Sequence, residues 1–289
     1  FVQVRGRGDC LYRSSLVPRS EILKDHKFDP LQYVIQEGHK LQLKVHAWVN
    51  VYMLWSAERH PSYEHHLFNR HPDWLDAVME ETNKYLYTTE RLTTDASGQD
   101  GFYLAPNHPS VNPYLLAVFK EILNNYNLDG LHLDYVRYKN QYYGYNSVGI
   151  ENFNNRYSSS NNFDSEFIQT VGNKDLYNNY LMKREETLLN SITELVIKLN
   201  SFITNMKREI TLSAAVKPNI ETAKKLYFQE WGMWLSGGLI DWVLVMNYDP
   251  NFQTFVNNIT AIENRMSIIE IRKIVMGVAL YNQTPENAL

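Results

Sequence analysis

The chain has 289 residues, of which 44% are hydrophobic, and its formal net charge is −4. This length and composition suffice for one large buried core and predict a single domain over residues 1–289. Because 28 Lys and Arg residues are set against 32 Asp and Glu residues, no basic surplus is available to neutralise a phosphate backbone or an anionic membrane, and we expect no nucleic-acid partner.

Aromatic residues make up 13% of the chain, which favours carbohydrate as a ligand because aromatic faces stack on sugar rings. The single cysteine, Cys10, excludes an intrachain disulfide. No apolar run approaches the roughly 20 residues that span a bilayer, so we expect no integral membrane segment. The strand-like opening Phe1 to Val4 lacks a signal-peptide pattern, which predicts that any export signal was removed or never present.

Short apolar runs alternate with stretches of helical spacing along the chain, a pattern typical of repeated βα units and a parallel sheet. Most of these runs are apolar on both faces, as expected of strands that are covered on both sides. The six predicted strands are Phe1 to Val4, Lys44 to Val49, Gly130 to Tyr135, Ile210 to Val216, Trp242 to Met246 and Ile274 to Leu280.

Helical spacing between these strands predicts the outer layer of the fold. Asp29 and Pro30 are a helix-start signal, and Gly237 followed by Gly238 predicts a left-handed helix end. The predicted helices run from Asp29 to about Leu41, from Pro109 to Tyr126, from Leu188 to Met206, up to Gly237, and from Phe252 to Ile271.

Two segments break this rhythm, at about 56–101 and 139–173, and both are predicted to be long loops on the catalytic face of a barrel. The first contains His60, His65, His66 and His71, whose spacing fits no zinc pattern, so we expect solvated loop histidines. A closed barrel needs eight strands. The predicted fold is therefore a (β/α)8 TIM barrel with terminal strands missing from the chain as given.

The strongest local signal for chemistry is the segment Asp129 to Tyr138, in which an apolar strand ends in Asp134 and is followed by Tyr135 and Arg137. Barrel enzymes keep catalytic groups at the carboxyl ends of strands, which makes Asp134 the first candidate. The alternative is an Asp that caps the next loop. Strand alternation puts His132 on the same face, where a hydrogen-bonded packing residue is the competing interpretation.

A second carboxylate follows the apolar run Trp242 to Met246, which delivers Asn247, Tyr248 and Asp249 at its carboxyl end. Glycosidic cleavage typically uses two carboxyl groups, one to protonate the leaving oxygen and one to act as nucleophile or base. Asp134 and Asp249 are therefore the predicted catalytic pair. The proline after Asp249 also fits a turn and a helix cap, which is the structural alternative.

The first two strands also lead into polar residues at their carboxyl ends. The first continues into Arg5 to Asp9 (RGRGD), and the second into Asn50. Arg5, Asp9 and Asn50 are predicted to converge on one face and to hold sugar hydroxyls through fixed hydrogen bonds. The glycines predict a tight loop; a dinucleotide fingerprint is excluded because the third glycine is missing and no helix follows directly.

Together these motifs resemble the glycosyl hydrolase-like 10 family of bacterial barrel proteins. The resemblance covers nearly the whole chain, and it implies a (β/α)8 fold and hydrolysis of a glycan, which in some relatives is bacterial cell-wall polysaccharide. In chain order the motifs are Phe1 to Tyr12 (FVQVRGRGDCLY), Lys44 to Tyr52 (KVHAWVNVY), Asp129 to Tyr138 (DGLHLDYVRY), Trp231 to Tyr248 (WGMWLSGGLIDWVLVMNY) and Met276 to Asn282 (MGVALYN).

The chain departs from this family at one position. Members commonly carry a second acidic residue after the strand-ending Asp, whereas this chain has Tyr135, so Asp134 is the only carboxylate there. The chain is also similar to chitinase-type barrels in DGLHLDYV and MNYD. Those enzymes place their proton-donating Glu two residues past the last Asp, where this chain has Val136, so a substrate-assisted mechanism lacks its acid. Tyr248 resembles the tyrosine that supports the anomeric centre in such sites.

The combined prediction is a glycoside hydrolase without metal or cofactor, in which Asp134 acts as nucleophile or acid and Asp249 is its partner. The predicted sugar-binding residues are Arg5, Asp9, Trp48, Asn50, His132, Arg137, Tyr248 and Tyr281. The rival is a non-catalytic carbohydrate-binding barrel, favoured by the missing second acid. A barrel lyase or isomerase would need a metal or phosphate site, for which we find no motif. The resemblance implies the bacterial periplasm or envelope, with a lipoprotein as one option, and carries no signal for an oligomeric state.

Overall fold

The computed structural model describes residues 1–289 apart from 58, 80–84, 87–100, 162–173 and 280–289. Its centre is a six-stranded sheet in the order β1-β2-β7-β8-β9-β10, and each neighbouring pair is parallel. The six predicted strands are confirmed, with ends that differ by a few residues. Their bounds are Val2–Arg5 (β1), His46–Asn50 (β2), Gly130–Asp134 (β7), Thr211–Val216 (β8), Trp242–Met246 (β9) and Ile274–Gly277 (β10).

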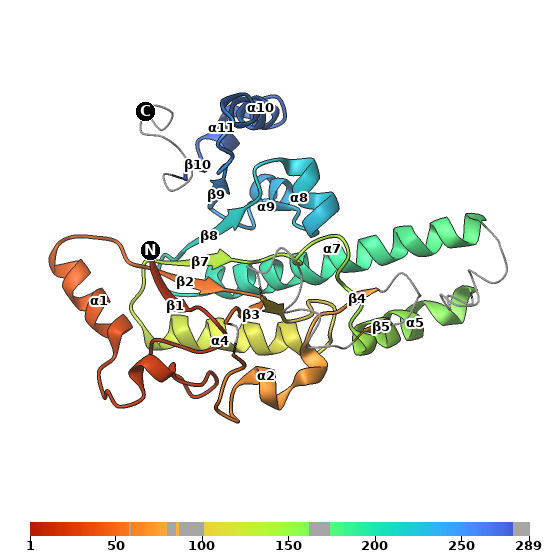
Figure 1. Ribbon diagram of the computed structural model, residues 1–289. Helices are drawn as coiled ribbons and strands as arrows, with labels where there is room; N and C mark the ends of the chain where they lie inside the picture. Colours follow the sequence, from red (N-terminus) through yellow and green to blue (C-terminus); the bar gives the residue numbers. More distant parts are fainter. Residues whose placement is uncertain (58, 80–84, 87–100, 162–173, 280–289) are drawn as a thin grey trace.

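The sheet is strongly curled, and ring contacts across its inner face show by how much. His46 on β2 and Trp242 on β9 are three strands apart, which is about 14 Å along a flat sheet, yet their ring centroids are 6.0 Å apart. Phe1, next to β1, and His132 on β7 are 4.8 Å apart in the same way. Figure 1 shows the strands fanning from β1 to β10. Within the described ranges no ladder joins β1 to β10, so the barrel is open on that side.

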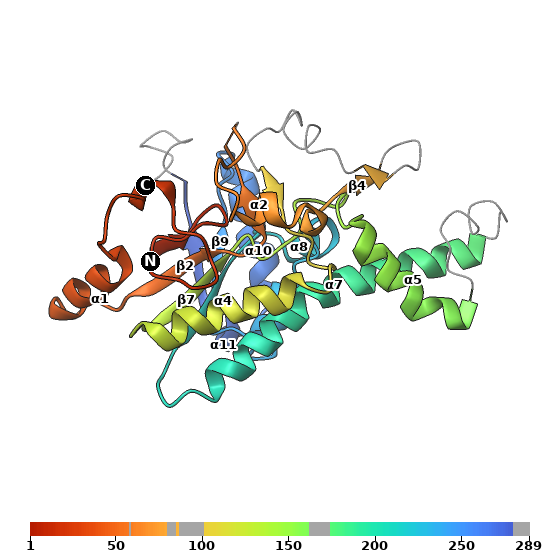
Figure 2. The same ribbon diagram turned by 90° about the horizontal axis from the view of Figure 1, so that it is seen from below.

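Helices cover the outer face of the sheet, and their buried side chains join the strands in one core. Helices α4 and α7 contact each other and run side by side in Figure 2. None of the described helices has the length and apolar character that crossing a bilayer requires. The principal helices are α1 (Pro30–Lys40), α4 (Val111–Asn125), α7 (Lys174–Thr204), α8 (Ile220–Tyr227), α9 (Trp231–Ser236), α10 (Phe252–Glu263) and α11 (Ile268–Ile271).

The helix ends follow local chemistry in most places. Asp29 caps α1 as predicted, because its side chain accepts a hydrogen bond from the Gln32 backbone N–H at 3.1 Å. Gly238, just past α9, adopts the predicted left-handed conformation with φ +68°. The single helix predicted from Phe252 to Ile271 is wrong. It is divided into α10 and α11, because Ser267 and Glu270 form a capping box that starts a new helix.

The two long connections contain more regular structure than predicted. Segment 139–173 includes α5 (Ser147–Asn161), on which Phe153 packs at 5.7 Å from the Tyr180 ring of α7. Tertiary contact with α7 therefore supports a segment whose own apolar periodicity is weak. The connection after β2 contains β3 (Met53–Trp55), α2 (Leu67–Arg70), η2 (Pro72–Trp74), β4 (Val78–Met79), β5 (Tyr85–Leu86) and β6 (Phe102–Tyr103), with β3 antiparallel to β6.

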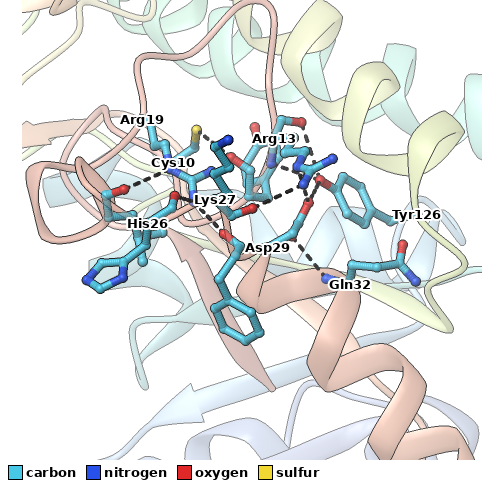
Figure 3. A network of polar contacts seen from close by, with 11 residues as sticks. Cys10, Arg13, Arg19, His26, Lys27, Asp29, Gln32 and Tyr126 are labelled. Carbon is cyan, nitrogen blue, oxygen red and sulfur yellow. Dashed lines mark hydrogen bonds and ion pairs between the residues drawn. The ribbon is translucent and has the colours of Figure 1, made fainter.

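The connection from β1 to α1 is fixed by a network of side-chain to backbone hydrogen bonds (Figure 3). Arg13 donates to the Lys27 carbonyl at 3.1 Å, and Arg19 donates to the His26 carbonyl at 2.9 Å. The hydroxyl of Tyr126, the residue that follows α4, donates to Asp29 at 2.7 Å and ties this connection to the helical layer. The β1–α1 connection is therefore an ordered part of the carboxyl-end face.

Asp76 joins the two long connections from a buried position. Its Oδ1 accepts hydrogen bonds from the Ala77 N–H at 2.9 Å and the Gly144 N–H at 3.0 Å, whereas its Oδ2 has no hydrogen-bond partner among the described residues. Burial raises the pKa of Asp76 to about 7, although these two hydrogen bonds and the Arg184 guanidinium oppose the shift. The native state therefore holds a proton on Asp76 in the weakly acidic range.

This raised pKa predicts a stability change with pH. Between about pH 4 and pH 7 the native state binds a proton that the unfolded chain has released, so the Asp76 contribution to stability falls as pH rises through this window. Asp76→Asn keeps an oxygen for both N–H groups and removes the buried charge. We expect it to raise the free energy of unfolding by on the order of 2 kcal/mol at pH 8, and by much less at pH 5.

Urea unfolding of both proteins at the two pH values measures this difference, and Asp25→Asn, at an exposed position of the β1–α1 connection, is the matched control. An Asp76→Asn variant that is destabilised equally at pH 5 and pH 8 would show that Asp76 does not carry the charge penalty.

Candidate functional site

A cavity of about 1080 Å³ opens at the carboxyl ends of the strands and extends down the inner face of the curled sheet. Every strand of the sheet contributes to its lining, and on β2, β7 and β10 alternate residues do so, which is the pattern expected of side chains that point inward; β9 contributes the consecutive residues Leu244 to Met246. The strand residues in the lining include Gln3, Trp48, Asn50, His132, Asp134, Ala215, Leu244, Met246, Val275 and Gly277. The inner face is therefore a polar and aromatic site, in contrast to the apolar packing predicted for both faces.

Asp134, the last residue of β7, lines this cavity and is 9% exposed. Its Oδ1 accepts a hydrogen bond from the Tyr135 N–H at 2.7 Å. Tyr135 holds this position with a left-handed φ of 51°, an uncommon conformation for a bulky residue that must be supported by its surroundings. The backbone after β7 is thus shaped to hold the Asp134 carboxyl in one place.

The surroundings of Asp134 raise the pKa of its carboxyl group, so it keeps its proton to a higher pH than an exposed Asp does. Burial raises the pKa of Asp134, although the Tyr135 N–H, the Arg137 guanidinium and the Trp48 indole oppose the rise. A carboxyl group with a raised pKa is suited to protonating a leaving-group oxygen, as an acid catalyst of glycoside cleavage must. The geometry is therefore compatible with the acid role among the two predicted for Asp134.

His132 lies on the floor of the cavity, one inward-facing position below Asp134. Its Nδ1 is 3.0 Å from the Ser213 hydroxyl, and its ring contacts Phe1 and Trp48. Burial lowers the pKa of His132 to about 4, so the imidazole is neutral at neutral pH. His132 therefore offers the cavity a neutral imidazole in an aromatic floor, which fits contact with a sugar better than proton transfer.

Arg137 and Tyr248 line the same cavity from either side of Asp134. The Arg137 guanidinium lies 5.0 Å from the Tyr135 ring centroid and 5.3 Å from that of Tyr227, so aromatic faces fix its orientation. The Tyr248 side chain is 41% exposed. A Cβ at Gly277 would come within 3.1 Å of its ring, so this glycine leaves room for Tyr248 at the rim.

Asn50 ends β2 directly beside Asp134, its register partner on β7. Its Nδ2 donates to the Gly6 carbonyl at 2.9 Å, and its Oδ1 is buried without a hydrogen-bond partner among the described residues. A buried acceptor of this kind is costly unless a ligand or water satisfies it. Asn50 therefore ties the turn after β1 to the strand end beside Asp134 and carries a buried, unsatisfied acceptor there.

Arg5 and Asp249 lie outside the lining that the described residues form. Arg5 is fully buried behind the strand ends, where its Nη1 donates to the Asn50 and Val51 carbonyls. The carboxyl of Asp249 accepts the Asn251 N–H at 2.8 Å in the turn before α10. Both positions lie at or beyond the end of a strand, where alternation no longer determines side-chain direction. The catalytic pairing of Asp134 with Asp249 stays a prediction, and Tyr281 lies outside the described residues.

One histidine prediction requires correction. His66 is fully buried instead of solvated. Its Nδ1 accepts the Phe68 N–H at 3.2 Å, which leaves Nε2 to donate to the Arg7 carbonyl at 2.7 Å. Burial lowers the pKa of His66, in agreement with this neutral form. His66 therefore caps α2 and holds the loop that follows β1. In the described part of the chain, no group of three or more His, Cys, Asp or Glu side chains is arranged to hold a metal ion.

The lining also contains residues that the sequence prediction missed. Lys217 directly follows β8, so the strand-end argument would have found it if applied to that strand. Trp55 ends β3, shortly after β2. Glu21 and Tyr63 come from connections, and no local pattern marks them as site residues. The site is therefore built by the strand ends together with the β1–α1 connection and the connection after β2.

A curled parallel sheet with an acidic and aromatic cavity at its carboxyl ends is the arrangement of glycosidase-type α/β barrels. The chain belongs to the Glycosyl hydrolase-like 10 family, whose model matches residues 1–286. It is 27% identical over 158 residues to glycosyl hydrolase YngK of Bacillus subtilis, covering 52% of this chain and 26% of that protein. It is 29% identical over 139 residues to glycosyl hydrolase DigH of Escherichia coli, covering 46% of this chain and 29% of that protein.

Solved structures show the same fold. The glycoside hydrolase domain of PgaB (BpsB) from Bordetella bronchiseptica matches with a TM-score of 0.60 at 13% identity, covering 96% of this chain and 72% of that chain. Alpha-L-fucosidase isoenzyme 2 from Paenibacillus thiaminolyticus matches with a TM-score of 0.50 at 13% identity, covering 99% and 41%. The chain spans between a quarter and a third of the length of YngK and DigH. Family and fold together support a glycosidase-type function.

Proposed function

We propose that this protein hydrolyses glycosidic bonds of a glycan and that Asp134 is the proton donor of the reaction. The observation that carries the proposal is the buried Asp134 carboxyl, with a raised pKa, in the lining of a cavity of about 1080 Å³ at the carboxyl ends of the strands. A cavity of this size accommodates a few sugar units, and membership of a glycosyl hydrolase-like family supports the reaction class.

The walls of the cavity supply the contacts that a sugar requires. Trp48 and Tyr248 offer aromatic faces for stacking, and the Asn50 carboxamide lies in the lining beside Asp134. His132 and Arg137 supply further polar groups on the floor and at the rim. In this arrangement the sugar ring lies against the aromatic side chains with its glycosidic oxygen at the Asp134 carboxyl.

Bacterial envelope glycan is the substrate class that we propose first. An S-layer-related protein of Niallia circulans, 29% identical over 113 residues, supports a location at or outside the cell surface. That match covers 39% of this chain and 7% of the S-layer-related protein.

Release of new reducing ends tests the proposal. The chain is incubated with bacterial cell-wall glycan and with plant and host polysaccharides, and binding to each glycan is measured in parallel. We expect hydrolysis of at least one glycan. Binding without new reducing ends would instead identify the non-catalytic carbohydrate-binding barrel, which the aromatic walls of the cavity also fit. If the chain neither binds nor hydrolyses any glycan of the set, both functions are overturned.

A further inference from the structure

A second carboxyl group, that of Asp9, also lines the cavity. Of the acidic residues that the structure describes, Asp9, Glu21 and Asp134 line the cavity. Asp9 is half-buried in the turn after β1, whereas Glu21 is exposed in the short helix η1 (Glu21–Leu23) and accepts a hydrogen bond from the Ser62 hydroxyl. Asp9 is thus the more enclosed of the two carboxyl groups that accompany Asp134.

The turn that carries Asp9 is tightly held at the end of β1. Cys10 pairs back with Arg5, and the Leu11 N–H donates to the Val4 carbonyl at 2.9 Å, so residues 6–9 form a compact turn above the strand. Gly8 adopts a left-handed φ of +74°. A Cβ at Gly8 would lie 2.5 Å from the Leu54 side chain and 2.9 Å from His66 Nε2, so only glycine fits there.

The other side of this turn is fixed as well. The Cys10 N–H donates to the Pro18 carbonyl and the Ser20 N–H donates to the Cys10 carbonyl, both at 2.9 Å. His66 holds the Arg7 carbonyl from α2. A carboxyl group carried by such a turn is preorganised, which is what a catalytic group needs and a flexible surface Asp lacks.

The sheet order sets the spacing between the two strand ends that Asp9 and Asp134 follow or terminate. Strand β2 lies between β1 and β7, so two interstrand steps of about 4.8 Å separate the end of β1 from that of β7. Inverting glycosidases keep their two carboxyl groups about 6.5 to 9.5 Å apart, with room for a water between them. Asn50 ends the strand between the two, and its Nδ2 donates to the Gly6 carbonyl in the turn that carries Asp9.

Asp249 follows β9, whose end is also two interstrand steps from the end of β7, on the other side, because β8 lies between β7 and β9. Each carboxyl accepts one backbone hydrogen bond, Asp249 from the Asn251 N–H at 2.8 Å and Asp9 from the Arg7 N–H at 3.3 Å, but only Asp9 belongs to the cavity lining formed by the described residues. Side-chain direction, and not strand spacing, therefore distinguishes the two candidate partners of Asp134.

We infer that Asp9 is the second catalytic carboxyl group, acting as the base in an inverting hydrolysis; the inference rests on the proposed function. Asp134 transfers its proton to the glycosidic oxygen as the bond from that oxygen to the anomeric carbon breaks. The oxygen of one water forms the new bond to the anomeric carbon, and Asp9 takes a proton from that water. The products are two hydroxyl-bearing sugars, and exchange with solvent restores both carboxyl groups.

The inference is tested on whichever glycan the wild-type chain hydrolyses. Asp9→Asn is expected to lower kcat by about 100-fold or more while leaving glycan binding nearly unchanged, because the carboxamide cannot accept the proton. Asp25→Asn, in the same connection but exposed, is the control and should leave kcat within about threefold. Melting temperature and glycan binding of Asp9→Asn report whether the variant is folded.

The anomeric configuration of the first product, followed by NMR, gives a second and independent readout. Inversion supports the pairing of Asp9 with Asp134, and retention would overturn it. A kcat for Asp9→Asn close to wild type, together with a large fall for Glu21→Gln or Asp249→Asn, would assign the base to one of those residues and overturn the inference alone. Absence of hydrolysis by the wild-type chain would overturn the proposed function and this inference with it.

Discussion

Asp134→Asn is expected to lower kcat by about 1,000-fold, because a carboxamide cannot deliver a proton to the leaving oxygen and general acid catalysis contributes about 10² to 10⁴ in rate. The Asn side chain keeps an oxygen that can accept the Tyr135 N–H, so the backbone after β7 should hold its conformation. The variant also removes a buried carboxyl whose pKa is raised by burial, so we expect no loss of melting temperature.

The opposite end of the same strand offers a matched control. Asp129 precedes β7, and its Oδ2 accepts hydrogen bonds from the Val45 N–H and from His39, both at 2.8 Å. Asp129→Asn should lower the melting temperature while leaving kcat nearly unchanged, because the amino ends of barrel strands serve stability. Steady-state kinetics and thermal unfolding of both variants measure the contrast. Hydrolysis that persists in Asp134→Asn would remove Asp134 from the mechanism.

The architecture was predictable because buried parallel strands produce short apolar runs that stand out between helices. The run ending in Asp134 is an example, and β7 closes at that residue. What the runs do not reveal is the character of the inner face. His46 stacks on Trp242, and Phe1 contacts His132, across the inside of the curled sheet, and these contacts depend on curvature, which no single strand encodes.

Site placement was predictable as far as the strand ends and no further. Asn50 and Asp134 end neighbouring strands and lie together in the cavity lining, because period-two alternation applies up to the last strand residue. Arg5, at the irregular end of β1, and Asp249, three residues beyond β9, turn away because local backbone hydrogen bonds determine their direction. Glu21 enters the lining only through the folding of a connection, which has no local signature.

The helical layer carries the prediction with the largest effect on stability, at Trp234. This side chain of α9 is fully buried, and its indole N–H donates to the Thr193 hydroxyl of α7 at 2.9 Å. Trp234→Ala removes a large aromatic side chain and leaves a cavity between α9 and α7. It also removes the indole N–H that donates to the Thr193 hydroxyl. We expect the free energy of unfolding to fall by about 4 kcal/mol, measured by urea denaturation at fixed pH.

Trp242→Ala is the matched control, since Trp242 is 40% exposed on the open inner face of β9, where it stacks on His46 at 6.0 Å. We expect this variant to lose only about 1 kcal/mol, because truncating a partly exposed ring leaves no closed cavity. The contrast follows from the position of the core, which lies between the sheet and its outer helices and not inside the open barrel. Equal losses for the two variants would mean that the inner face is packed as tightly as the helical layer and that the cavity around Asp134 is not open in solution.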